Sequence, residues 1–209
     1  MTGLGRMIVT VASFKGGVGK TTTSIHLAAY LQRDKPTLLI DGDANRSSLD
    51  WHTRGPGLSF MVCDELQSVR YAKQYEHCVI DTGARPATED LKTLIGGCDL
   101  LVIPASPDAL SLHVLTEMVD ALRGLKTDHY RVLLTIIPPK PENDGEEARA
   151  SLEEIGMPLF ETHIRRFKAF GKAALHGIPV YDVKRDHNAG EAWGDYEAIG
   201  REILNGWNR

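Results

Sequence analysis

The stretch MIVTVASFKGGVGKTT, residues 7–22, decides the fold of this chain. It begins with an apolar run, Met7–Ala12, whose lack of polar alternation is typical of a strand buried on both faces. A glycine-rich loop follows, and residues of helical character begin at Lys20. Glycines let backbone N–H groups converge on phosphate oxygens, and a helix N-terminus adds a partial positive charge. The stretch therefore predicts a strand, a phosphate-binding loop and a helix.

The loop residues have predictable roles. Lys20 is expected to reach the β- and γ-phosphates of a nucleotide, and the Thr21 hydroxyl to ligate Mg²⁺. The strict phosphate-loop pattern needs a glycine where this chain has Phe14, and Lys15 comes one residue later. A glycine-rich turn with solvated lysines is the alternative interpretation. The residues expected to bind nucleotide here are Lys15, Gly16, Gly17, Val18, Gly19, Lys20, Thr21 and Thr22.

Short apolar runs alternate with longer helical segments along the rest of the chain. The predicted strands are Met7–Ala12, Thr37–Ile40, Cys78–Ile80, Leu100–Pro104, Arg131–Ile137 and a weaker one near Leu159–Thr162. The predicted helices span residues 20–33, 64–75, 88–95, 109–124, 144–155, 167–176 and 190–206. This alternation predicts a doubly wound α/β fold, with a mostly parallel sheet covered by helices on both faces. Ligands bind such sheets at the carboxyl ends of the strands.

The composition predicts one soluble, cytoplasmic domain over residues 1–209. The chain carries 24 Lys and Arg against 28 Asp and Glu, a net charge of −4, which gives no overall attraction to nucleic acid or anionic membranes. Its three cysteines are scattered, which argues against a disulfide framework. The sequence lacks a long apolar segment and an apolar signal-peptide core.

The sequence of the phosphate loop resembles the corresponding motif of a known family. Lys15-Gly-Gly-Val-Gly-Lys-Thr-Thr22 is similar to the deviant Walker A motif of the ParA/MinD ATPases, whose hallmark is a second lysine, here Lys15. The resemblance continues through four further segments in the family's order, and the short chain resembles the small ParA-type partition and positioning ATPases, which lack an N-terminal helix-turn-helix domain. These segments are Leu38–Asp43, Val79–Thr82, Asp99–Pro104 and Phe160–Val180.

The resemblance implies roles for the second lysine and for the strand-end carboxylates. Lys15 has no evident partner in its own loop, and in the family such a lysine reaches the ATP of the other subunit in a sandwich dimer. Asp43 would position the hydrolytic water, Asp81 would be the Walker B acid, and Asp41 would support them. The implied catalytic residues are Lys15, Lys20 and Asp43, and the implied Mg²⁺ ligands are Thr21, Asp43 and Asp81. A solvated loop lysine and loop-capping aspartates are the alternatives.

The chain departs from the family pattern at two places. Ala44-Asn45 stands where the family usually has Pro-Gln, and Gly83-Ala84 replaces a double proline. The second departure lies in the segment that senses the γ-phosphate in relatives, so it bears on hydrolysis rate and partner response.

A local basic segment lies within the acidic chain. Residues 163–185 carry six Lys and Arg and one acid. By resemblance, Arg166 and Phe167 lie near adenine. The other bases could form a DNA-binding face in a dimer, or the ordinary solvated side of a helix. The predicted DNA-binding residues are Arg165, Lys168, Lys172, Lys184 and Arg185.

The C-terminus argues against a membrane role. Residues 186–209 hold five acids and two Arg, the wrong sign for an anionic bilayer, so their aromatic face is expected to pack on the domain. We therefore expect a nucleoid-associated ATPase with ATP and Mg²⁺ as cofactors. Its expected partners are a second copy, non-specific DNA and a cargo-bound adaptor that stimulates hydrolysis. The alternatives are a metabolic enzyme of the dethiobiotin-synthetase kind and a MinD-like membrane regulator.

Overall fold

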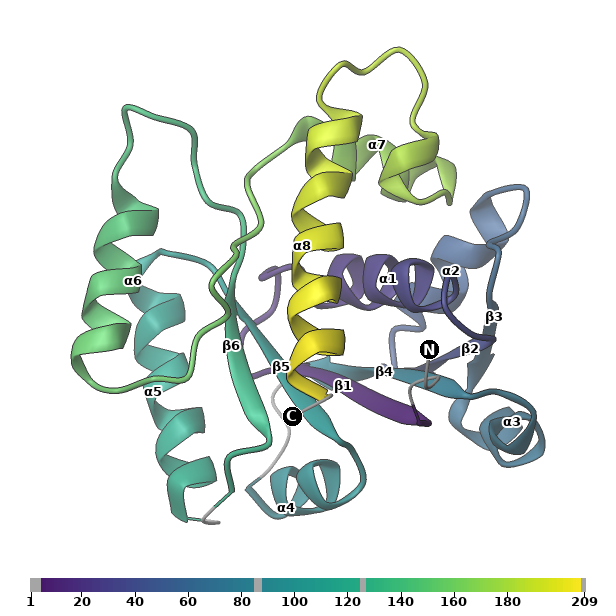
Figure 1. The fold of residues 1–209 in the computed structure, drawn as a ribbon, viewed down its shortest axis with the longest axis horizontal. Helices are drawn as coiled ribbons and strands as arrows, with labels where there is room; N and C mark the ends of the chain where they lie inside the picture. The colour runs from purple at the N-terminus through teal and green to yellow at the C-terminus, as the bar shows by residue number, and fades with distance from the viewer. Residues whose placement is uncertain (1–4, 85–87, 125–126, 208–209) are drawn as a thin grey trace.

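A parallel sheet forms the centre of the computed structural model, which describes residues 5–84, 88–124 and 127–207. Within these ranges six strands pair in the order β3-β2-β4-β1-β5-β6, all parallel (Figure 1). The predicted α/β class is thereby confirmed. The strands are β1 (Met7–Ser13), β2 (Thr37–Gly42), β3 (Met61–Asp64), β4 (His77–Ala84), β5 (Leu100–Ala105) and β6 (Tyr130–Leu134).

Helices cover both faces of this sheet (Figure 1). The helices are α1 (Lys20–Leu31), α2 (Ser47–Arg54), α3 (Glu65–Tyr71), α4 (Thr88–Gly96), α5 (Ala109–Gly124), α6 (Asp144–Glu154), α7 (Lys168–His176) and α8 (Ala189–Trp207), with the 3₁₀ turns η1 (Ala72–Gln74) and η2 (Val180–Asp182).

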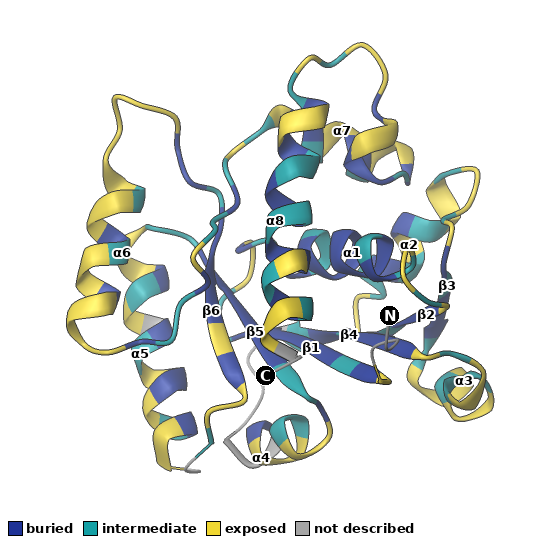
Figure 2. Cartoon of the chain, viewed as in Figure 1, coloured by how far each residue is buried: buried dark blue, intermediate teal, exposed yellow. Residues whose placement is uncertain are grey.

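The described residues form three buried apolar clusters, and alternation along the strands separates the two largest. Val102 of β5 packs with α1, α2, α7 and α8, whereas its neighbours Leu101 and Ile103 pack with α4, α5 and α6. Successive side chains of a strand point to opposite faces, so an uninterrupted apolar run supplies both cores at once. Figure 2 shows the strands almost wholly buried and the outer surfaces of α3 and α6 exposed.

The predicted strand near Leu159–Thr162 is wrong. Leu159 makes one isolated bridge to Val132 and no strand forms. The backbone N–H groups of Glu161 and Thr162 donate instead to the carboxylate of Glu202 on α8, both at 2.8 Å. The Glu202 carboxylate thus accepts the two backbone N–H groups that would otherwise have donated to a neighbouring strand. Sequence reasoning also missed β3 and α2, which are only four and eight residues long.

The last helix, α8, packs against α1 (Figure 1). Tyr196, Ile199 and Ile203 of α8 are buried in the core, as predicted for its apolar face. The Tyr196 hydroxyl lies 3.1 Å from the Thr23 hydroxyl of α1. Within the described part of the chain, every helix is too short or too polar to cross a lipid bilayer.

A histidine lies at the centre of this packing. His26 of α1 is fully buried and stacks on the Tyr196 ring, with ring centroids 4.8 Å apart. Its Nδ1 lies 2.6 Å from the Thr22 carbonyl oxygen, and its Nε2 accepts the Val180 N–H at 3.0 Å. Because Nε2 accepts, the proton of the neutral ring is on Nδ1. Burial lowers the pKa of His26 to about 4, although the hydrogen bond to Thr22 opposes this shift.

A close backbone contact joins α2 to the turn between α7 and η2. A Cβ added at Gly55, just after α2, would lie 2.3 Å from the Gly177 carbonyl oxygen. The Trp51 indole N–H donates to the Ile178 carbonyl at 3.2 Å, and Arg54 donates to the Ala174 carbonyl at 2.8 Å. These contacts fix α2 against the turn that carries the end of the basic segment.

Candidate functional site

The phosphate loop connects β1 to α1 as predicted. Gly17 and Gly19 adopt positive φ values of 79° and 85°, which L side chains rarely adopt. A Cβ added at Gly16, Gly17 or Gly19 would meet no atom within 4 Å, so packing does not require these glycines. The Thr135 hydroxyl donates to the Val18 carbonyl at 2.8 Å and anchors the loop beside β6. The loop is thus an anchored concave backbone that leaves space beside it.

This loop fits a phosphate group. The N-cap residue of α1, Gly19, has no side chain to cap the helix, and the first turn of α1 has no acidic residue, so its backbone N–H groups can bind an anion. Lys20 is buried, with 8% of its surface exposed, and makes no ion pair within the described ranges. A buried cation without an acidic partner needs an anion from outside the chain. The phosphates of a nucleotide would supply one.

The Asp81 carboxylate lies beside this loop at the carboxyl end of β4. It is fully buried and in register with Asp41 of β2. The Ser24 hydroxyl donates to its Oδ1 at 3.0 Å, and the Ser48 hydroxyl to its Oδ2 at 2.8 Å. Burial raises the pKa of Asp81 to about 6, opposed by hydrogen bonds from Ser48, Thr21 and Ser24. The predicted Walker B acid therefore contacts the predicted Mg²⁺ ligand Thr21.

Asp43 lies just beyond β2 and is held by its own loop. The buried Asp41 carboxylate accepts the Asp43 backbone N–H at 3.0 Å, so Asp41 supports Asp43 as the sequence predicted. Asn45 donates to Asp43 Oδ1 from both its backbone N–H and its side-chain amide. Thr21, Asp43 and Asp81 offer the hard oxygen ligands that Mg²⁺ prefers, so the residues present fit that ion.

Lys15 has a partner within its own chain, outside the phosphate loop. Its Nζ lies 2.5 Å from Asp108 Oδ1, in the turn before α5. Asp108 also accepts the Ser111 N–H at 3.0 Å. Desolvation would raise the pKa of Asp108, but hydrogen bonds from Lys15 and Ser106 outweigh it and hold the pKa at about 2. The ion pair therefore persists at neutral pH and gives the second lysine a position in the single chain.

Several bases of the segment 163–185 are paired with acids of the same chain, so not all of them are free to contact DNA. Arg165 donates to the buried Asp195 carboxylate through Nε and Nη2 and also pairs with Glu191. Its charge is thus compensated inside the chain, which weakens its prediction as a DNA contact. Arg166 pairs with Glu142 at 3.1 Å. Phe167 directly precedes α7, and the Arg165 guanidinium lies over its ring, 4.9 Å from the centroid.

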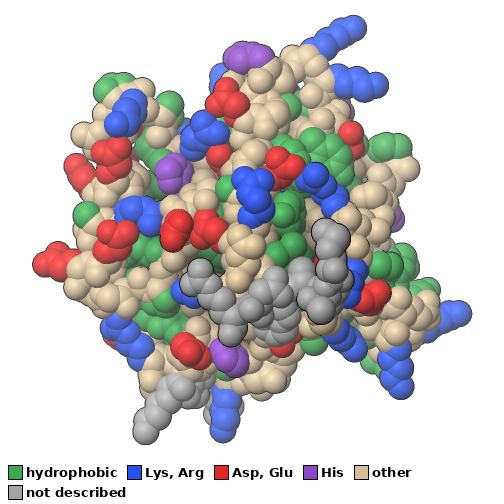
Figure 3. Space-filling model, in the orientation of Figure 1, with side chains coloured by type: hydrophobic (Ala, Val, Ile, Leu, Met, Phe, Trp, Pro, Cys, Tyr) green, Lys and Arg blue, Asp and Glu red, His purple; other side chains and the backbone are tan. Residues whose placement is uncertain are grey.

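The other four predicted DNA contacts lie on α7 and on the chain before α8. Lys172 pairs with Asp186 at 2.8 Å. Lys168, Lys184 and Arg185 are exposed and make no ion pair within residues 5–84, 88–124 and 127–207. In Figure 3, Lys and Arg side chains project from the upper end of the molecule, where Figure 1 places α7 and the loop before α8.

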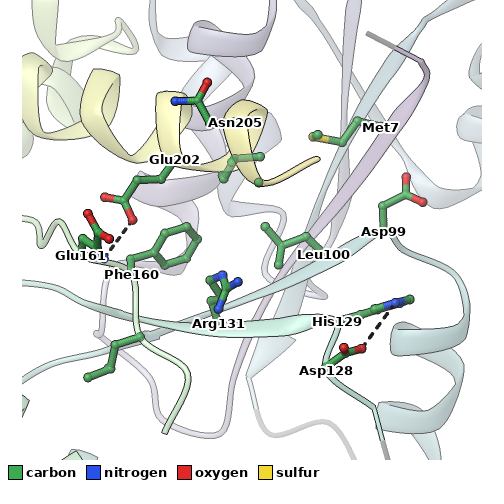
Figure 4. Close-up of a pocket in the computed structure, with 13 residues that line it drawn as sticks. Met7, Asp99, Leu100, Asp128, His129, Arg131, Phe160, Glu161, Glu202 and Asn205 are labelled. Carbon is green, nitrogen blue, oxygen red and sulfur yellow. Dashed lines mark hydrogen bonds and ion pairs between the residues drawn. The ribbon is translucent and has the colours of Figure 1, made fainter. Parts of the chain in front are cut away.

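A cavity of about 870 Å³ lies at the opposite edge of the sheet from the phosphate loop. Its lining includes Met7 and Leu100, which begin β1 and β5, and Arg131 near the start of β6. Figure 4 shows Glu202 of α8 on one side of this cavity and Asp128 on the other. The cavity is remote from the carboxyl ends of the strands, so it is not the nucleotide site.

Comparison with known families decides the assignment. Residues 9–180 match the model of the CobQ/CobB/MinD/ParA nucleotide binding domain, which covers most of the chain. The chain belongs to the MinD/ParA family. Members of this family are ATPases, and the chain is an ATPase of this type.

Relatives of this MinD/ParA protein match nearly its whole length. Maintenance of carboxysome distribution protein A of Gloeobacter kilaueensis is 38% identical, over 97% of this chain and 96% of that protein. Protein ParA of Rhizobium radiobacter is 28% identical, over 94% and 96% respectively. A Cyanothece McdA variant solved as an ATP complex has a TM-score of 0.75 at 17% identity, over 96% of this chain and 97% of that chain. The last likeness shows a shared fold.

Several residues of the MinD/ParA site escaped sequence reasoning. Ser24 lies three residues after Thr21, on the same helix face, so helical spacing could have placed it beside Asp81. Ser48 and Asp108 carry no such signal, because their partners lie 33 and 93 residues away. Asn45 was noted only as a departure from the family pattern.

Proposed function

We propose that this chain is an ATP-dependent positioning ATPase. Mg²⁺–ATP drives a sandwich dimer, the dimer binds DNA without sequence preference, and a cargo-bound adaptor stimulates hydrolysis and release. The observation that carries this proposal is the presence of two lysines in one phosphate loop. Lys20 is buried and has no acidic partner within the described ranges, whereas Lys15 is held by Asp108. Turnover without the adaptor is slow in this cycle.

The phosphate loop supports the first step. Bound Mg²⁺ would neutralise phosphate charge and be held by Thr21, Asp43 and Asp81. Lys20 binds the phosphates of its own subunit. Lys15 then exchanges Asp108 for the partner's phosphates, a charge-for-charge exchange that leaves no lysine unpaired. Dimer formation thus depends on the nucleotide.

The exposed bases support the second step. Lys168, Lys184 and Arg185 offer three uncompensated charges per subunit within the described ranges, hence six in a dimer. Six phosphate contacts correspond to a logarithmic salt slope of roughly −5, at about −0.9 per contact. A monomer with half that number binds weakly, which makes DNA binding a readout of dimerisation.

The names of two relatives support a cargo-positioning role. The Gloeobacter protein is named for carboxysome distribution and the Rhizobium protein is named ParA, so a cargo-positioning role is consistent with both. The cargo of this chain would be a plasmid, a chromosome or a protein compartment. The proposal locates the protein in the cytoplasm, on the nucleoid.

One experiment tests the proposed function against the alternatives. The purified protein is mixed with fluorescent random-sequence duplex DNA and ATP, ADP or no nucleotide, at about 50 mM salt. Phosphate release is measured in parallel without any small acceptor. We expect DNA binding with ATP alone and slow acceptor-independent hydrolysis.

The alternatives give different results. A metabolic enzyme would need an acceptor for turnover and would ignore DNA, and a membrane regulator would bind anionic vesicles in preference to DNA. The absence of an ATP-dependent DNA complex at low salt would contradict the positioning mechanism.

A further inference from the structure

We propose that Asn45 is the positioning residue that determines which oxygen of Asp43 faces the nucleotide. This inference rests on the proposed role of Asp43 in ATP hydrolysis. Asn45 lies two residues after Asp43, in the loop between β2 and α2. Its backbone N–H and its side-chain amide both donate to Asp43 Oδ1, at 2.9 and 3.0 Å. One residue thus directs two donors at one carboxylate oxygen.

The other carboxylate oxygen is left available. Within the described ranges, Asp43 Oδ2 makes no hydrogen bond, and Asp43 keeps 9% of its surface exposed. A carboxylate has lone pairs on both oxygens, so Oδ2 can accept a hydrogen bond from a water molecule. Occupation of Oδ1 by Asn45 therefore selects Oδ2 as the oxygen that orients the attacking water.

The backbone that carries this pair is already fixed. The Asp43 N–H donates to Asp41 Oδ1 at 3.0 Å, and the Arg46 N–H donates to the Asp43 carbonyl at 2.9 Å. Arg46 closes the turn with a φ of 55°, and its guanidinium donates to the Asp41 carbonyl at 2.9 Å. Rotation about the side-chain bonds of Asp43 is the freedom that remains, and the Asn45 amide restricts it together with the Asn45 backbone N–H.

Control of this rotation matters for the reaction. A carboxylate that orients water lowers the barrier only while its oxygen keeps a fixed direction, and a displacement of about 1 Å can cost about 10²-fold in rate. A Gln at this position would carry its amide one methylene further along the side chain. The shorter Asn side chain places its amide nitrogen 3.0 Å from the carboxylate oxygen of Asp43, two residues earlier.

Substitutions at Asn45 separate positioning from binding. Asn45→Ala keeps the backbone donor and removes the amide. We expect kcat for ATP hydrolysis to fall about tenfold, as for the loss of a hydrogen bond to a charged group, while KM for ATP and the ATP-dependent dimer stay unchanged. Asn45→Asp replaces the donor by a second carboxylate and should lower kcat further. Asn45→Gln should retain part of kcat.

A matched control and the possible outcomes complete the test. Asn143→Ala removes an exposed amide before α6 that makes no capping hydrogen bond, and it should leave kcat unchanged. An unaltered kcat in Asn45→Ala, or a loss of ATP binding in it, would overturn the positioning role. A wild-type protein that hydrolyses no ATP would instead overturn the proposed function.

Discussion

Lowering the pH should destabilise the fold through His26. The folded protein holds this ring neutral, with a pKa of about 4, whereas the unfolded chain has the ordinary value near 6.5. Between these values the unfolded state binds more protons, so the free energy of unfolding falls as the pH falls. The difference of about 2.5 pH units corresponds to about 3 kcal/mol, of which about 2 kcal/mol falls between pH 7 and pH 4.5.

A second buried group acts in the opposite direction over the same pH range. Burial raises the pKa of Asp81 to about 6, so the folded state binds its proton first as the pH falls. Protonation of Asp81 therefore stabilises the fold at acid pH, and that stabilisation is lost as the pH rises through about 6. The pH dependence of the wild-type protein alone would hide the contribution of His26.

Comparison with His26→Gln isolates that contribution. The Gln carbonyl can accept the Val180 N–H in place of Nε2, and it does not titrate. Asp81 is present in both proteins, so its contribution to the pH dependence cancels in the comparison. Urea unfolding at about pH 7 and pH 4.5 should show the wild type losing about 2 kcal/mol more than the variant. His113→Gln, at an exposed position on α5, should follow the wild type. Parallel loss in wild type and His26→Gln would refute the reasoning.

Four further substitutions test the nucleotide site and the basic face. Lys20→Ala should lose ATP binding in a fluorescent-nucleotide titration, because the phosphates lose a buried cation, whereas Asp43→Ala should bind ATP and release phosphate slowly; equal loss of binding in both would make Asp43 structural. Lys15→Gln should bind nucleotide as a monomer but form no ATP-dependent dimer by light scattering, and a normal dimer would contradict the cross-subunit role. Lys184→Glu should weaken DNA binding severalfold and flatten the salt slope. Lys73→Glu on the distant η1 serves as its control, and an equal effect of both would contradict a local DNA face.

The α/β class and the phosphate loop could be predicted because local sequence patterns indicate both. The apolar run Met7–Ala12 and the glycines after it specify a buried strand and a tight loop through short-range patterns. The carboxylates Asp43 and Asp81 follow similar runs, so the meeting of strand ends at one sheet edge brings them together.

The contacts that orient these groups could not be predicted in the same way. Lys15 and Asp108 are 93 residues apart, and a Ser-Pro-Asp sequence indicates only a turn or a helix cap. Glu202 captures two backbone N–H groups of the chain after α6, which turned a predicted strand into a bend. Contacts of this kind form only in the packed tertiary structure, and no periodic pattern in a single sequence indicates them.

The contact between Gly55 and Gly177 places an unusual restriction on sequence change. Most pairs of closely packed residues can change together during evolution, because a larger side chain at one position is offset by a smaller side chain at the other. Here neither position has a side chain to reduce, and each added Cβ would lie 2.3 Å from the backbone of the other glycine. The two codons, more than a hundred positions apart, are therefore expected to stay glycine together across descendants of this chain. Substitutions in the basic segment should therefore occur at the residues on either side of Gly177 and not at Gly177 itself.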